Sequence, residues 1–304
     1  MILNVKNETS KLEAVVLGIP DSIGPKPTLE ETYDSKSYES IKLNLYPEES
    51  DFVYEMGEFE KVLKKHNVQV FRPWVLENCN QVFARDVGMV IDDKFIIANI
   101  IPDRADEQEA YERIINSVAK DKVIQVPENV HVEGGDVILW NEFMFVGTYK
   151  QNDYKKYKTA RTNFEAVQFF KDLFPNKWVI DLELVKDDFD PYKGILHLDC
   201  TFQPVGHNKA IIYKDGFLNP MHYDILISLF GRDNVFEVTK EEMYWMNPNV
   251  FSISPEIVVS EQNFTRLNNH MRDVWGMSVE EIPYRNISRM GGLLRCSTLP
   301  LIRA

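Results

Sequence analysis

The order of apolar and polar positions repeats along the chain. Each repeat has two short apolar runs of strand length, then a segment with apolar residues every three or four positions, then a third short run. In the clearest copy the first two runs are 87–91 and 94–100, a helix is expected at about 105–119, and 123–126 closes the unit. The pattern predicts a unit of strand, strand, helix and strand.

Three further copies follow in the same order. Their expected helices lie at about 161–174, 221–230 and 263–275. Gly231 and Gly276 mark the C-terminal ends of the last two, because glycine readily ends a helix.

A fifth copy combines both ends of the chain. Residues 291–298 supply its first strand, 13–18 its second, 51–66 its helix and 68–71 its third strand. One unit alone leaves an apolar helix face uncovered, so we expect five units to pack around a common axis as a closed ring. The fold class predicted is α/β, in one domain over residues 1–304.

The segment 19–50 interrupts this pattern. It is rich in proline and tyrosine and connects two elements of the fifth unit. A connection of that length is typical of a functional loop such as a lid, and it is equally typical of a packed surface loop. Both interpretations stay open at this point.

The composition excludes some partners. The formal net charge is −13, with no basic patch, so we expect no nucleic-acid partner. The first residues show no signal peptide and no apolar run is long enough to cross a bilayer, so we expect a cytoplasmic protein without a membrane partner. Formation of a homo-oligomer is left open.

The three cysteines are Cys79, Cys200 and Cys296. They are few, odd in number and lack the spacing of a metal site, which is consistent with a reducing compartment. Cys79 and Cys200 are expected to be small buried apolar residues. No cofactor is indicated.

Five polar residues stand where a repeat's first strand begins. They are Asp86, Glu133, His197, Asp199 and Cys296. In a ring, equivalent positions converge on the axis, so these side chains are expected to share one small space. Buried carboxylates cost several kcal/mol each unless a cation meets them, so this set indicates a functional site rather than a core.

A metal site is the main alternative. His131 and Glu133 are two positions apart on a predicted strand, as are His197 and Asp199, so each pair would share a face and could bind zinc or iron. A metal site does not explain why Cys296 follows a pair of glycines, so we predict no metal.

Together, FARD, HVEGGD, HLDCTF and the C-terminal GG-LLRCST resemble the guanidino-group-modifying superfamily. Its members include arginine deiminase, dimethylargininase, agmatine deiminase and glycine amidinotransferase. The motifs occur in the same order over residues 80 to 300. The resemblance implies a five-bladed ββαβ propeller, the pentein fold, with pseudo-fivefold symmetry.

The resemblance also implies a role for each of the five residues. Cys296 would be the nucleophile, His197 the general acid and base, and Glu133 the carboxylate that acts with His197. Asp86 and Asp199 would hold the guanidinium group of an arginine-like substrate. These residue types suit the chemistry, since a guanidinium carbon is a poor electrophile that needs a thiolate and rigid positioning.

The motifs point in two directions for the reaction. Glu133 resembles the hydrolases, whereas HLDCTF resembles the transferases. We expect a hydrolase acting on arginine or a substituted arginine through an amidino-cysteine intermediate. The alternatives are an amidinotransferase that uses an amine acceptor, and a non-catalytic propeller binding protein, which has no reason to keep the whole set.

Some assignments stay open. The role of Asp136 is undecided, and a substrate carboxylate could be bound by one of four arginines. Glycines in two of the motifs are expected either to let the backbone approach the substrate or to form ordinary turns. The four arginines are Arg85, Arg161, Arg289 and Arg295, and the glycines are Gly134, Gly135, Gly291 and Gly292.

Overall fold

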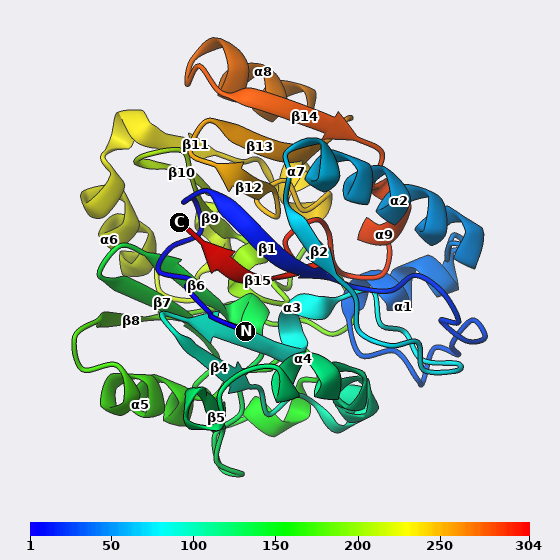
Figure 1. The fold of residues 1–304 in the computed structure, drawn as a ribbon. Coiled ribbons are helices and arrows are strands. Elements are labelled where there is room, and N and C mark those ends of the chain that lie inside the picture. The colour runs from blue at the N-terminus through cyan, green and yellow to red at the C-terminus, as the bar shows by residue number, and fades with distance from the viewer.

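The computed structural model describes residues 1–304 and contains five three-stranded sheets (Figure 1). Each sheet has the same internal order. The first strand pairs antiparallel with the second, and the second pairs parallel with the third. The sheets are β15 (Thr298–Arg303), β1 (Leu12–Leu17), β2 (Gln69–Phe71); β3 (Gly88–Ile91), β4 (Lys94–Ile97), β5 (Val123–Gln125); β6 (Val137–Trp140), β7 (Phe143–Thr148), β8 (Trp178–Glu183); β9 (Phe202–Val205), β10 (Lys209–Ile212), β11 (Val235–Glu237); and β12 (Phe251–Ser254), β13 (Ile257–Glu261), β14 (Ser278–Ile282).

Helices connect the second and third strands of the sheets, as parallel pairing requires. In Figure 1 helices α2, α5, α6 and α8 lie on the outside, around the strands. The connecting helices are α1 (Ser35–Lys42) and α2 (Glu49–Lys65), α4 (Glu112–Asn116), α5 (Phe164–Leu173), α6 (Met221–Phe230) and α8 (Thr265–Asp273). The longer ones bury apolar residues, as α5 does with Val167 and Phe170, whereas the buried residues of α1 are three serines and a lysine.

The α/β class is confirmed, and the five expected units correspond to the five sheets. The helix expected at 221–230 is α6 with the same bounds. The fifth unit does join both ends of the chain, because β15 pairs with β1 and Leu17 lies opposite Thr298. Two hydrophobic clusters fill the interior between the sheets and the helices.

The helix expected at 105–119 was wrong in type and bounds. Residues Pro102–Tyr111 form a 3₁₀ helix, η1, and only Glu112–Asn116 are α-helical. In a 3₁₀ helix positions i and i+3 lie directly above one another. This places Glu107 over Arg104, whose Nε and Nη2 donate to the two carboxylate oxygens at 2.6 and 2.8 Å. The ion pair is buried, which favours the tighter helix over an amphipathic α-helix.

The strand expected at 291–298 was also wrong. Gly291 has φ of +84°, and Ser297 and Thr298 donate backbone hydrogen bonds to Leu293 and Arg295, so this stretch is a series of turns. The strand begins only at Thr298. Cys296 therefore lies in a turn directly before the strand and not within it.

The segment 19–50 is an ordered connection that contains α1. Asp34 caps this helix through a 2.7 Å hydrogen bond from the Ser37 amide to its Oδ1. The Ser40 hydroxyl donates to the Arg289 carbonyl across the molecule. The segment is thus tied to the turn that precedes Cys296.

No helix of this structure combines the length and the apolar character that crossing a membrane requires.

Candidate active site

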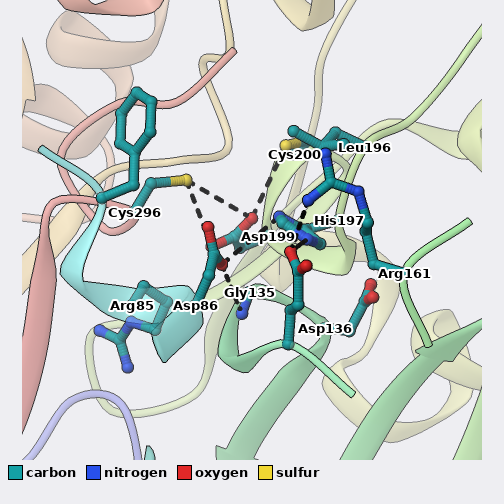
Figure 2. A network of polar contacts seen from close by, with 12 residues as sticks. Arg85, Asp86, Gly135, Asp136, Arg161, Leu196, His197, Asp199, Cys200 and Cys296 are labelled. Carbon is teal, nitrogen blue, oxygen red and sulfur yellow. Dashed lines mark hydrogen bonds and ion pairs between the residues drawn. The ribbon is translucent and has the colours of Figure 1, made fainter. Parts of the chain in front are cut away.

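Four motifs deliver their polar side chains in the same way. In the sheets that begin with β3, β6, β9 and β15, a short helical turn or bend stands immediately before the first strand. The turns are α3 (Ala84–Val87), η3 (Gly134–Asp136), η5 (Leu198–Cys200) and the turns at 291–297. Asp86, Glu133, His197, Asp199 and Cys296 are all buried there. Figure 2 shows Asp86, His197, Asp199 and Cys296 around one small space, and Glu133 is in contact with His197.

The expected strands at 131–133 and 197–199 were wrong. As a result, His131 and Glu133 do not share a face. Glu133 and His197 are the residues that precede η3 and η5, so the period of two does not apply. His131 is exposed and takes no part in the site, whereas Glu133 is fully buried. His197 and Asp199 do both belong to the site, on either side of the turn.

His197 is held in a network of charged groups. Its Nε2 lies 2.8 Å from Glu133 Oε2, and its Nδ1 lies 3.6 Å from Asp86 Oδ1. Glu133 Oε2 also accepts a 2.7 Å hydrogen bond from Arg161 Nη1. Burial lowers the pKa of His197, but the charges of Asp86 and Glu133 outweigh burial and raise this pKa above its ordinary value. His197 is therefore set to carry a proton.

The carboxyl group of Glu133 is kept ionised. Burial raises its pKa, but Arg161 and His197 more than compensate, and the pKa lies well below its ordinary value. Glycine is needed at position 135 beside this network, because a Cβ there would come within 2.7 Å of the His197 ring. The absence of a side chain at Gly135 thus makes room for the imidazole of His197.

Cys296 has a different environment. Asn249 Nδ2 lies 3.2 Å from its Sγ, and Asn249 Oδ1 accepts from its backbone amide at 3.2 Å. The sulfur is 3.7 and 3.9 Å from the two carboxylate oxygens of Asp199. Burial, followed by the negative charges of Asp199 and Asp86, raises the pKa of the thiol well above its ordinary value.

No hydrogen bond joins Cys296 to His197. In the view of Figure 2, Asp86 and Asp199 lie between them. Sulfur and imidazole therefore face a common space from opposite sides instead of forming a preassembled thiolate–imidazolium pair. A planar cation placed in that space would meet both.

Buried arginines hold the two aspartates. Arg104 Nη1 donates to Asp86 Oδ2 at 2.7 Å, and Arg295 Nη1 donates to Asp199 Oδ2 at 2.8 Å. Arg295 is fixed in turn by Glu8, whose pKa is lowered to about 2: the charge of Arg295 outweighs the effect of burial. Asp86 Oδ1 accepts a 3.2 Å hydrogen bond from the Gly135 amide, whereas Asp199 Oδ1 lies near the sulfurs of Cys200 and Cys296.

Sequence reasoning missed Arg104, Glu8 and Asn249. Arg104 lies in η1, where an ordinary amphipathic helix was expected. Asn249 had a usable signal, since it stands two residues before β12, as Asp86 stands two residues before β3. Glu8 had none, because only the tertiary fold brings residue 8 to residue 295.

Other residues considered for the site have structural contacts or lie apart from it. Asp136 accepts hydrogen bonds from the Leu198 amide and the Thr162 hydroxyl at 2.9 and 2.7 Å, so it anchors η5 to the neighbouring sheet. Arg85 binds the Arg295 carbonyl and Thr298, away from the shared space. Cys200 is buried as expected, whereas Cys79 is only partly buried.

Asp86, Glu133 and His197 offer three ligand atoms within 4.8 Å of one another, a separation that could suit a metal ion. The donor set argues against this. Arg161 and Arg104 lie 2.7 and 3.9 Å from the same oxygen of Glu133. Two guanidinium charges so close would repel a divalent cation, and they already neutralise the carboxylates.

Comparison with solved structures shows the class of fold. The chain resembles SxtG, an amidinotransferase from Microseira wollei in the saxitoxin biosynthetic pathway, with 17% identity, 99% of this chain and 97% of that chain covered, and a TM-score of 0.75. It also resembles the N-terminal domain of ArgZ, an arginine dihydrolase from the ornithine-ammonia cycle in cyanobacteria (15%, 96% and 98%, TM-score 0.77). A dimethylarginine dimethylaminohydrolase adduct with S-methyl-L-thiocitrulline gives 16%, 95% and 100%, and a TM-score of 0.70.

The fold, the motifs and a matching family model together define a member of the guanidino-group-modifying superfamily. Within it, a family model for eukaryotic N,N dimethylarginine dimethylhydrolase matches residues 30–303, and the chain belongs to this family of guanidino-modifying enzymes. The resemblance expected from the motifs is confirmed. An uncharacterized Bacillus subtilis protein, YkgA, is 26% identical over 300 residues, with 98% of this chain and 94% of that protein covered.

Proposed function

We propose that this protein is a cysteine-dependent hydrolase that cleaves a C–N bond in the guanidinium group of arginine or a substituted arginine. The observation that carries the proposal is the burial of Cys296 and His197 beside two carboxylates: Asp199 lies 3.7 Å from the sulfur, and Asp86 lies 3.6 Å from His197 Nδ1. A planar cation held by these carboxylates would be attacked by the sulfur and protonated by the imidazole.

Substrate binding uses the two aspartates. Their Oδ2 atoms are held by Arg104 and Arg295, and Asp86 Oδ1 accepts from the Gly135 amide. The remaining lone pairs of the two Oδ1 atoms can accept N–H groups of the guanidinium in charge-assisted hydrogen bonds. Rigid positioning matters here because the guanidinium charge is delocalised and its carbon is a weak electrophile. The buried arginines supply that rigidity.

The thiol is activated by the substrate itself. In the empty site the aspartates and burial favour the neutral thiol of Cys296. A bound guanidinium cancels the negative charge around the sulfur and so lowers the thiol pKa. The thiol proton passes to solvent as the substrate binds, and the thiolate then bonds to the guanidinium carbon, which becomes tetrahedral. When the C–S bond breaks at the end of the reaction, the sulfur recovers a proton from the hydroxyl group of the forming ureido product.

His197 completes both halves of the reaction. It donates its proton to the leaving nitrogen as the C–N bond breaks, which releases an amine and leaves an amidino-cysteine. His197 then accepts a proton from water as the water oxygen bonds to the same carbon. Breaking the C–S bond releases a ureido product and restores Cys296. Glu133 keeps the imidazole oriented and supports its charge.

Membership of a dimethylhydrolase family supports water as the acceptor. The second candidate is amidinotransfer to an amine, because the HLDCTF motif resembles the transferases and the fold is shared with an amidinotransferase. A purely binding function is disfavoured, since the nucleophile, imidazole and carboxylates are all present and buried together.

We further infer that residues 1–304 form one catalytic domain whose five sheets surround a single axis, with 19–50 as its lid. Arg161 Nη2 donates to the Tyr33 carbonyl at 2.7 Å, so this segment reaches the Glu133 side of the site. All five candidate site residues are buried with the segment in place. Opening of 19–50 would give substrate a path to Cys296.

The test is incubation with arginine, methylated arginines and agmatine, with and without glycine as acceptor. A ureido product without acceptor supports hydrolysis, and a product only with acceptor supports transfer. A haloacetamidine, which carries the substrate's cation, should label Cys296 much faster than Cys79 or Cys200. Slow and equal labelling of all three cysteines, with no product, would leave only the binding function.

A further inference from the structure

Asp34, the residue that caps α1, has a carboxylate oxygen without a partner. Its side chain is buried, and its Oδ1 accepts from the Ser37 amide. Its Oδ2 is buried too and has no hydrogen bond. Burial raises the pKa of this carboxyl group, and the Ser37 hydrogen bond and the charge of Arg161 offset this only in part.

Asp34 lines a cavity that adjoins the active site. The cavity lies between α1 and the residues around η5, and Cys200 also lines it. Cys200 Sγ is 3.6 Å from Asp199 Oδ1, and Asp199 lies 3.7 Å from Cys296 Sγ. The cavity is therefore next to the position we assign to the guanidinium.

The turn before Cys296 is shaped to receive Asp34. A Cβ at Gly291 would lie 2.5 Å from Asp34 Oδ1, so a larger residue would push the carboxylate or the turn away. Gly291 also has φ of +84°, a conformation that glycine adopts readily. The close approach of the two segments is thus allowed by this glycine.

The nearby cations do not neutralise Oδ2. Lys36 also lines the cavity, but it forms no ion pair with Asp34, and its ammonium lies over the rings of Tyr244 and Trp245 at 3.4 and 4.8 Å. Arg161 directs its donors to Glu133 and to the Tyr33 and Lys158 carbonyls. A buried carboxylate oxygen left unpaired is costly, so such an oxygen indicates a missing donor.

We propose that Asp34 binds a primary ammonium group of the ligand when the 19–50 segment is closed over the site. The inference rests on the proposed function and extends it to specificity: the enzyme selects guanidines that bring an ammonium group, as an α-amino acid does. The ammonium comes from the guanidino substrate or, if the reaction is a transfer, from a separate acceptor amine. Asp34 is a specificity-determining residue and not a catalytic one.

The experiment compares two substrates that differ only in the ammonium group, L-arginine and 5-guanidinopentanoic acid, in wild type and Asp34→Asn. Asparagine caps helices as well as aspartate does, so the fold of α1 is preserved. We expect kcat/KM for arginine to fall about 10- to 100-fold, the range for a lost charged hydrogen bond, and kcat/KM for the des-amino analogue to change less than about 3-fold.

Glu39→Gln is the matched control. Glu39 lies on the same helix and accepts a 2.6 Å hydrogen bond from the Tyr244 hydroxyl, so it contributes to docking of α1 without reaching the cavity. A docking defect changes both substrates alike. Equal losses for both substrates in Asp34→Asn, or no loss for either together with an unchanged KM for an acceptor amine, would overturn the proposal.

Two further measurements separate the possible failures. With glycine as acceptor, a rise in KM for glycine alone in Asp34→Asn assigns the ammonium to the acceptor. If the wild type converts no guanidine, the proposed function fails. Ligand-induced shifts of the melting temperature then judge Asp34: a larger shift with arginine than with its analogue, lost in Asp34→Asn, supports it, and equal shifts refute it.

Discussion

The two sides of the active site are built on different principles. On the imidazole side, His197, Glu133, Arg161, Asp86 and Arg104 form a continuous buried network with contacts of 2.7–3.9 Å. On the thiol side, Cys296 has one amide side chain and a carboxylate that disfavours its thiolate. The imidazole side is held by charged contacts without ligand, with only His197 Nδ1 left without a hydrogen bond, whereas the thiol side awaits a cation.

This difference suits the chemistry of a guanidinium. A permanently ionised thiolate beside an imidazolium would react with many electrophiles and oxidants. A thiol whose pKa falls only when a cation enters is activated by the correct substrate alone. The imidazole that acts as both acid and base, in contrast, must be oriented before the substrate arrives, because proton transfer requires a fixed geometry.

The largest effect is expected at the thiol. Cys296→Ala removes the atom that bonds to the substrate, so product formation should fall by at least about 1,000-fold while the melting temperature stays near that of wild type. Cys200→Ala is the control, because Cys200 also lies next to Asp199 but has no bonding role. Substantial turnover by Cys296→Ala would sink the mechanism.

His197→Gln tests the other side. Glutamine keeps a hydrogen bond to Glu133 but cannot transfer protons, so kcat should fall about 100- to 10,000-fold. Arginine should still bind, because the Asp86 and Asp199 oxygens remain. Binding is measured by the ligand-induced shift of the melting temperature. Loss of binding together with turnover would mean that His197 shapes the pocket and is not primarily a proton carrier.

The free energy of unfolding should also differ between the two sides of the active site, by a smaller effect than the loss of activity. Arg104→Gln leaves Asp86 and Glu107 buried without their cation and should lower the free energy of unfolding by about 3–5 kcal/mol. Asn249→Ala leaves the Cys296 amide without its side-chain acceptor and should lower it by about 1–3 kcal/mol. Urea unfolding gives both values, and equal losses would contradict a network confined to the imidazole side.

The smallest expected effect is on the pH dependence of stability. The folded-state pKa of His197 is raised, so its protonation contributes stability that is fully present below the unfolded pKa of about 6.5. This contribution is lost as the pH rises through the folded-state pKa. The difference in melting temperature between wild type and His197→Gln should therefore shrink with rising pH above neutrality. A difference independent of pH would show that the imidazole is neutral in the fold.

The repeat could be derived from sequence because each unit follows local rules. Alternating and helical periodicities mark strands and helices, and glycine marks helix ends, as Gly231 does after α6. Two of the wrong predictions have a common cause. At η1 and at 291–297 the backbone is set by buried polar contacts, those of Arg104 with Glu107 and those of the turns before Cys296, and a hydrophobic pattern carries no information about such contacts.

The candidate site divides in the same way. The sequence by itself determined the α/β repeat, the superfamily motifs and the five polar residues at the starts of strands, because these depend on local periodicity and short spacing. Only the tertiary structure decided which groups face one another. It brought Glu8 to Arg295, Arg104 to Asp86 and the Asp34 cap to Gly291, since contacts between residues far apart in the chain exist only once the sheets have packed.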